Sequence, residues 1–114
     1  MRKLREAVLA NEDMLRDCIH QEMAKPWGGT QEDFDLLERA LAFYAEEIAR
    51  MSDEILPDRA GTHQHRLVHE PIGVAVAYLA WNFPLLNLAY KIAPAMAAGC
   101  PIIIRPSAAT PISA

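Results

Sequence analysis

The apolar residues of the first half of the chain recur every three or four positions, which is the spacing of one face of a helix. Residues 2–24 carry one such face and are predicted to form a single helix that ends at residues 26–29. A second stripe occupies residues 30–55, where we expect Thr30 to cap the helix, the acids after it to favour its first turn, and Pro57 to stop it. This stripe consists of Phe34, Leu37, Leu41, Tyr44, Ile48, Met51 and Ile55.

The two predicted helices have two interpretations. One is a partner-binding or coiled-coil helix, and the other is an antiparallel helix pair that covers a sheet. About three heptads is short for a free coiled coil, so the covering pair is favoured. Residues 58–66 are predicted to be a polar loop, and residues 67–70 should be extended because a proline follows them.

The second half of the chain has continuous apolar runs instead of a periodic stripe. Residues 71–111 contain no acidic residue and only two cations, Lys91 and Arg105. The order of patterns is a strand over residues 72–80, a turn, a helix over residues 84–98 kinked by an internal proline, and a strand over residues 102–104. These are the parts of a parallel βαβ unit in an α/β fold.

The predicted sheet is incomplete. Two parallel strands cannot bury both faces of a sheet or cover its edges. Thr110-Pro111 is typical of a helix start, yet the sequence stops at Ala114. We therefore expect the chain to be a truncated part of a larger protein, or to fold only in an assembly.

Charge and composition exclude some classes of function. The 114 residues carry a net charge of -4, so no basic surface for nucleic acid is expected. No apolar run is long enough for a membrane helix, and no secretory signal is evident. Cys18 and Cys100 stand in different contexts, which favours unpaired thiols in the cytoplasm. The three histidines of residues 63–69 lack supporting ligands, so a solvated loop is favoured over a metal site.

Ligands of parallel sheets bind beyond the carboxyl ends of the strands, which here means residues 81–84 and 105–107. From the residues alone, each candidate also has an ordinary interpretation. Asn82 could cap the helix that follows, and the aromatic residues beside it could belong to the core. Lys91 could be a costly buried ammonium or could extend to water. Arg105 could bind phosphate or pair with a carboxylate of the first half.

The same region resembles the aldehyde dehydrogenase superfamily. The resemblance rests on the order and spacing of several motifs and extends upstream to Lys25-Pro26 and Phe43-Tyr44-Ala45-Glu46, so that it covers nearly the whole chain. The motifs are Glu70-Pro71-Ile72-Gly73-Val74, Trp81-Asn82-Phe83-Pro84-Leu85, Lys91-Ile92-Ala93-Pro94-Ala95, Ala97-Ala98-Gly99-Cys100, Arg105-Pro106-Ser107 and Thr110-Pro111.

The resemblance implies NAD- or NADP-dependent oxidation of an aldehyde to a carboxylic acid through a cysteine thiohemiacetal. It implies a Rossmann-like cofactor domain that starts at residues 67–114, with residues 1–66 as a helical segment and loop packed on it. The family's oxyanion-holding asparagine corresponds to Asn82, and its proton-relay lysine to Lys91. The implied cofactor residues are Trp81, Arg105, Pro106, Ser107 and Ala108. The implied substrate residues are Phe83, Asn87 and Tyr90.

Some residues depart from the family pattern. Arg105 replaces a lysine and Ala108 a ribose-binding glutamate, which leaves the choice between NAD and NADP open. Neither cysteine matches the family's nucleophile, so the chain alone is expected to be inactive. The resemblance leans toward semialdehyde-oxidising members and implies a small aldehyde substrate and a homo-oligomeric complete protein. The alternative hypothesis is a non-catalytic remnant that acts as a binding or assembly module.

Overall fold

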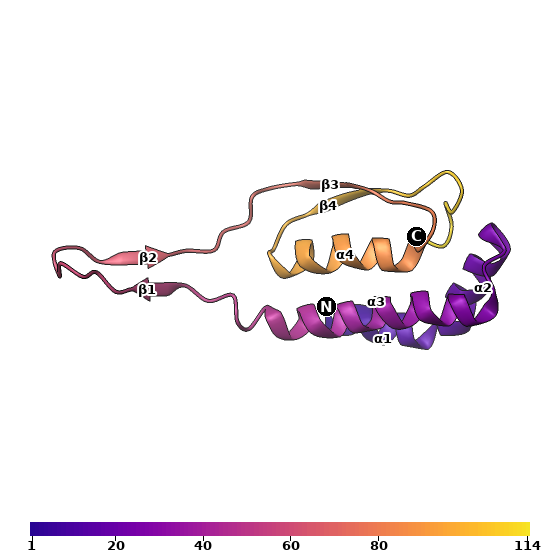
Figure 1. Cartoon of the computed structure of the whole chain (residues 1–114), viewed down its shortest axis with the longest axis horizontal. Coiled ribbons are helices and arrows are strands. Elements are labelled where there is room, and N and C mark those ends of the chain that lie inside the picture. The colour runs from indigo at the N-terminus through magenta and orange to yellow at the C-terminus, as the bar shows by residue number, and fades with distance from the viewer.

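The computed structural model describes residues 1–114. Four helices and four short strands follow one another along the chain, and the body of the molecule is layered (Figure 1). The elements are α1 (Arg2–Ala10), α2 (Glu12–Met23), α3 (Trp27–Glu47), β1 (Glu54–Leu56), β2 (His65–Leu67), β3 (Ala75–Tyr78), α4 (Pro84–Ala97) and β4 (Ile102–Arg105).

The predicted βαβ unit is confirmed. Strands β3 and β4 pair in parallel, with Ala75 opposite Ile102 and Tyr78 opposite Arg105, and α4 connects them. Gly99 ends this connection at a positive φ of 72°, as expected of the residue after a helix. A Cβ at this position would also stand 3.2 Å from the ring of Pro71, so a side chain here would be both strained and crowded.

The main core lies between helices. In Figure 1, α4 runs between the β3–β4 sheet and α3, and α1 and α2 both contact α3. The α/β class is therefore confirmed. Of the first-half helices, α3 packs on α4, α1 and α2 pack on α3, and α4 is the helix that lies against the sheet. The buried side chains of this core are Ile19, Phe34, Leu37, Ala40, Leu41, Leu85, Ala89 and Ala93.

The other face of the small sheet is exposed. Val76, Tyr78 and Ile103 keep 60%, 70% and 60% of their surface exposed.

None of the helices combines the length and apolar character needed to cross a membrane.

The single first helix predicted over residues 2–24 is wrong. The chain breaks at Asn11, whose backbone leaves the helical region at φ -121° and ψ 24°. Its side-chain amide donates a hydrogen bond to the carbonyl of Ala7. Asparagine side chains compete with the backbone in this way and so favour helix ends.

The second helix starts and ends earlier than predicted. It begins at Trp27 with Pro26 as its N-cap, so the two glycines lie inside its first turn, and the Thr30 hydroxyl donates to the carbonyl of Trp27 instead of capping. The helix ends at Glu47, and Ile55 lies in β1 with 68% of its surface exposed. The helical spacing of the last apolar residues is therefore coincidental.

The predicted polar loop is the tip of a hairpin. Strands β1 and β2 pair antiparallel and project from one end of the body in Figure 1, which makes the molecule 63 Å long and 24 Å wide. Asp58 organises the tip by accepting hydrogen bonds from the amides of Ala60, Thr62 and His63. These bonds hold the pKa of the Asp58 carboxyl below its usual value. The helix expected at Thr110 is also absent, because residues 108–113 form turns.

Candidate functional site

The two segments singled out by the sequence leave the sheet at the same edge. The parallel register places Tyr78, at the end of β3, opposite Arg105, at the end of β4. The segment after β3 contains the turn of residues 81–83, which leads directly into α4. The segment after β4 runs from Pro106 toward the C-terminus. The fold therefore gathers the predicted residues at the carboxyl ends of the strands.

A buried ion pair supports the turn of residues 81–83. The Lys25 ammonium lies 3.0 Å from the main-chain oxygen of Asn82 and 3.2 Å from Oδ2 of Asp33. It also lies 3.4 Å from the centre of the Phe83 ring. Lys25 keeps 9% of its surface and Asp33 none. The positive charge of this nearly buried lysine has lost most of its hydration, and one carboxylate, one carbonyl and one aromatic face compensate for that loss.

Asp33 caps helix α4 from a neighbouring helix. Its Oδ1 accepts the amide hydrogen of Leu86 at 2.8 Å, which is one of the donors that a helix start leaves unpaired. Burial raises the pKa of the Asp33 carboxyl, although the Leu86 amide and the Lys25 ammonium both act to lower it. The interpretation of Asn82 as the cap is therefore wrong, because the N-cap residue is Phe83 and the capping oxygen comes from α3.

The Asn82 side chain is left free. The residue is exposed, and its side-chain amide makes no hydrogen bond within the chain. Trp81 beside it keeps 55% of its surface, which contradicts its interpretation as a core aromatic, whereas Phe83 is half-buried under Lys25. Chemically, the turn presents an unengaged amide N–H donor on a fixed backbone.

Helix α4 carries three further predicted residues. Asn87 donates a weak hydrogen bond of 3.4 Å to the carbonyl of Ala80, which ties the helix back to the end of β3. Lys91 lies one turn further on the same face and is exposed, so the interpretation as a buried ammonium is wrong. Tyr90 keeps 55% of its surface.

The segment after β4 is held from α2. Glu22 accepts hydrogen bonds from the amides of Ile112 and Ser113 at 2.7 and 2.8 Å. Partial burial of the Glu22 carboxyl acts to raise its pKa, but hydrogen bonding from these two residues outweighs it and lowers the pKa. Ser107 adds a local turn, in which its hydroxyl accepts the amide of Ala109.

The charged and polar groups of this segment remain available. The Arg105 guanidinium forms no ion pair and lies 5.8 Å from the Tyr78 ring, so its interpretation as the partner of a first-half carboxylate is wrong. Arg105 and Ala108 are exposed, and Pro106 and Ser107 are half-buried. A free guanidinium and a serine hydroxyl at this edge are donors that suit phosphate or ribose oxygens.

The supporting residues were missed by the sequence analysis. Lys25 stands within a motif of the family resemblance, Asp33 is among the acids of the predicted first turn after Thr30, and Glu22 belongs to no motif. A signal did exist for Asp33, because residues 33, 37 and 41 fall on one helical face, and a carboxylate there interrupts an apolar stripe. The partners of Lys25 and Glu22 are 57 and 90 residues away along the chain, and no local pattern reports such contacts.

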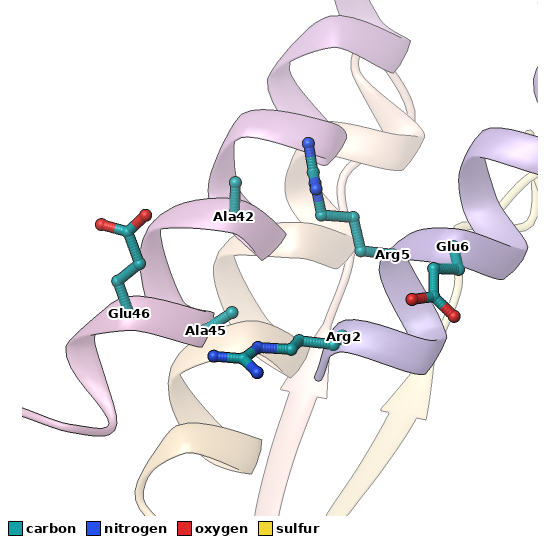
Figure 2. A pocket seen from close by; sticks show the side chains of 6 residues that line it. All are labelled: Arg2, Arg5, Glu6, Ala42, Ala45 and Glu46. Atoms are coloured by element: carbon teal, nitrogen blue, oxygen red, sulfur yellow. The ribbon is translucent and has the colours of Figure 1, made fainter.

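A hollow between α1 and α3 lies away from the strand ends. Figure 2 shows Arg2 and Arg5 of α1 directed toward α3, where Ala42 and Ala45 face them across a hollow of about 320 Å³. Arg5 is already paired with Glu38. No residue of this hollow belongs to the strand ends, so it takes no part in the candidate site.

The cysteines also lie apart from the turn of residues 81–83. Cys18 is half-buried in α2. Cys100 is buried just before β4, at the end of the strand opposite to Arg105. Neither thiol is placed at the carboxyl edge of the sheet.

Comparisons with known proteins give a consistent picture. The family model described as "Aldehyde dehydrogenase family" matches residues 1–114. A probable succinate-semialdehyde dehydrogenase [NADP(+)] of Sinorhizobium fredii is 35% identical over 107 residues, which cover 94% of this chain and 22% of that protein.

Two solved structures extend the similarity to the fold. A succinate-semialdehyde dehydrogenase from Burkholderia pseudomallei has a TM-score of 0.91 and 36% identity, over 98% of this chain and 23% of that one. A betaine aldehyde dehydrogenase variant from Staphylococcus aureus, solved in complex with NAD+, has a TM-score of 0.90 and 26% identity, over 98% of this chain and 23% of that one. The chain thus spans about a quarter of the length of the relatives that it matches.

Proposed function

Because this chain belongs to the aldehyde dehydrogenase family, we propose that it forms part of an NAD- or NADP-dependent enzyme that oxidises an aldehyde to a carboxylic acid. The observation that carries the proposal is the turn of residues 81–83. It presents the free amide of Asn82 at the carboxyl edge of a parallel sheet, on a backbone fixed by Lys25. The activity is proposed for a complete enzyme, because this chain spans only about a quarter of the length of its relatives.

In the proposed reaction, a cysteine thiolate adds to the aldehyde carbon and the carbonyl oxygen becomes an oxyanion. The Asn82 amide donates a hydrogen bond to that oxyanion, and a preorganised donor of this kind lowers the barrier by about 3 kcal/mol. Loss of a hydride from this adduct would leave a thioester, and hydrolysis of the thioester by water would give the carboxylic acid and return the thiol. Lys91, which is exposed on α4, would relay the proton that the thiol then releases. Because neither Cys18 nor Cys100 lies at this edge, the nucleophile is proposed to come from outside these 114 residues.

The residues after the two strands fit a dinucleotide. Arg105 is exposed and unpaired, and Ser107 offers a hydroxyl beside it. We propose that Trp81, Arg105, Pro106, Ser107 and Ala108 line the adenosine side of a cofactor cleft. NAD or NADP, when bound, accepts the hydride that leaves the substrate carbon. Phe83, Asn87 and Tyr90 are proposed to face the aldehyde.

A semialdehyde is the proposed substrate class. The relatives described above include two succinate-semialdehyde dehydrogenases, at 35% and 36% identity. The complete protein is further proposed to be a homo-oligomer in the cytoplasm. The two cysteines of this chain are unpaired, which suits a reducing compartment.

A second candidate function is a non-catalytic binding or assembly module. The exposed face of β3–β4 favours it, since Val76, Tyr78 and Ile103 each keep at least 60% of their surface. An apolar sheet face of this kind is normally covered by another surface. This hypothesis predicts association without turnover.

The test is to purify the native polypeptide, measure its intact mass and assay NADH or NADPH formation with a panel of semialdehydes and simple aldehydes. The dehydrogenase proposal predicts aldehyde-dependent reduction. Asn82→Ala should then lower kcat by about 10²–10³ with an unchanged KM for the cofactor. Gln21→Ala is the matched control, because this amide lies exposed on α2 and bonds only Asp17.

Two outcomes would contradict the dehydrogenase proposal. A native mass of 12.7 kDa without reduction of either cofactor would favour the binding module. Equal kcat values for Asn82→Ala and the parent enzyme would remove Asn82 from the oxyanion site.

A further inference from the structure

Lys25 and Asp33 connect the first half of the chain to the candidate site. Both side chains are nearly or fully buried, and they touch each other through Nζ and Oδ2. Each also reaches one backbone atom on the far side of the α3–α4 interface. Lys25 holds the carbonyl oxygen of Asn82, and Asp33 holds the amide of Leu86. These two backbone contacts bracket the junction between the turn of residues 81–83 and α4.

The bracket determines how the Asn82 peptide is oriented. The turn has no regular hydrogen bonding of its own, and Phe83 has the non-helical dihedrals φ -140° and ψ 75°. The bond from Lys25 directs the Asn82 carbonyl into the protein, while the Asn82 side chain stays exposed and unengaged. The Phe83 ring lies against the same ammonium, so one buried charge restrains two successive residues of the turn.

The first turn of α3 leaves room for the aliphatic part of the Lys25 side chain. Gly29 lies in its first turn, and a Cβ there would stand 3.3 Å from Cγ and 3.4 Å from Cε of Lys25. The neighbouring Gly28 has no heavy atom within 4 Å of the same position. The stem therefore runs over Gly29 on its way to the turn, which leaves the ammonium little freedom.

We propose that Lys25 and Asp33 are positioning residues that orient the Asn82 amide toward the oxyanion, an inference that rests on the proposed function. They act through the main chain of the turn and touch no reacting atom. Misplacement of a reacting group by about 1 Å can cost about 100-fold in rate. Loss of this bracket should therefore lower kcat and leave the KM for the cofactor unchanged.

The first experiment measures order in the 114-residue chain by NMR relaxation. In Lys25→Met the apolar stem is retained and the ammonium is removed. We expect the order parameters of the amides of residues 82 and 83 to fall below about 0.6, the range of flexible backbone, while α1 and α2 keep theirs. Lys3→Met is the matched control, because Lys3 is exposed on α1. Unchanged order at residues 82 and 83 in a folded Lys25→Met chain would overturn the inference.

Asp33→Asn is a milder second variant in case Lys25→Met does not fold. It keeps an oxygen for the Leu86 amide but removes the charge that fixes the ammonium. Its matched control is Asp35→Asn, whose carboxylate bonds only Gln31 on the same helix. We expect partial loss of order at residues 82 and 83 and none in the control. Equal order in both would overturn the role of Asp33.

The second experiment measures kinetics in the purified native enzyme. Asp33→Asn and Lys25→Met should each lower kcat by about 10–100-fold without raising the KM for the cofactor. A loss of order without any effect on kcat would contradict the positioning role. An enzyme that shows no turnover even before mutation would instead refute the proposed function. The NMR result would still show whether Lys25 and Asp33 restrain the backbone of residues 82 and 83.

Discussion

Removing the Lys25 ammonium should destabilise the fold far more than removing the whole Lys25–Asp33 pair. In Lys25→Met, the Asp33 carboxylate stays fully buried, and its main remaining partner is the Leu86 amide. A buried ion pair that loses one partner typically costs about 3–5 kcal/mol, because the other charge is left uncompensated. We expect about 3 kcal/mol of lost unfolding free energy near neutral pH, at the low end because the amide partner remains.

The double variant Lys25→Met/Asp33→Asn removes both charges and keeps an oxygen for the Leu86 amide. It should lie within about 1 kcal/mol of the parent protein, since neutral replacements of buried pairs are often tolerated. The two substitutions should therefore be non-additive by at least about 2 kcal/mol, because Asp33→Asn alone also leaves the buried ammonium without its carboxylate. Urea unfolding, followed by circular dichroism, gives the free energy of unfolding of the parent, of each single variant and of the double variant.

The pH dependence gives an independent check on the same pair. Burial raises the pKa of Asp33 above its ordinary value of 3.8, so the folded state binds this proton more tightly than the unfolded state does. The contribution to stability is then complete below pH 3.8 and is lost as the pH rises through the raised pKa. Lys25→Met removes a charge that lowers this pKa. We expect its defect to shrink on acidification, relative to the parent.

Two results would refute this reasoning. The first is a double variant that is as unstable as Lys25→Met, which would mean that packing of the lysine stem and not charge compensation carries the energy. The second is a Lys25→Met defect that grows on acidification, because the buried carboxyl would then not be the destabilising group.

Three further predictions follow from single contacts. Because the pKa of Glu22 is lowered in the folded state, this carboxylate contributes fully to folding stability above pH 4.5, and the contribution is lost as the pH falls through the lowered pKa. Glu22→Gln should lower the free energy of unfolding in urea by about 1–2 kcal/mol. Asp58→Ala should leave the three amides at the hairpin tip without their acceptor, so hydrogen exchange should speed up in β1 and β2 and stay unchanged in α3. Gly29→Ala should press on the stem of Lys25 and disturb the NMR signals of the turn of residues 81–83, whereas Gly28→Ala, which meets nothing within 4 Å, should stabilise α3 by about 0.5–1 kcal/mol. Equal spectra for the two glycine variants would contradict the crowding argument.

The second half of the chain was predictable because its signals are local and agree with one another. A continuous apolar run, a proline at the first helical position and a glycine just past the helix end each indicate the same βαβ unit, and α4 begins at Pro84 and is followed by Gly99 at positive φ. The parallel register then places the ends of both strands at one edge. The location of the candidate site therefore follows from pattern alone.

The first half was predicted less well because tertiary contacts overrule its spacing. Ile48, Met51 and Ile55 continue the helical stripe of α3, yet all three are exposed. The strand that contains Ile55 exists because it pairs with residues 65–67, which no helical periodicity can indicate. Likewise, Thr30 is of a residue type that often caps helices, but the N-cap of α3 is Pro26, four residues earlier, where proline fixes φ.

The residues that sequence reasoning could not find share one property. Glu22, Lys25 and Asp33 all lie at or near the α2–α3 junction, and each bonds a backbone atom that follows one of the two parallel strands. Their side chains carry the charges, but their partners are main-chain groups, which have no residue-type signature. A sequence shows only which side chains are available at the strand ends. The side chains at the α2–α3 junction bond main-chain groups that lie 53 to 91 residues further along the chain, and these bonds fix the backbone of the segments after the strands. Variants at the junction should therefore change the orientation of the Asn82 amide while the amide itself stays intact.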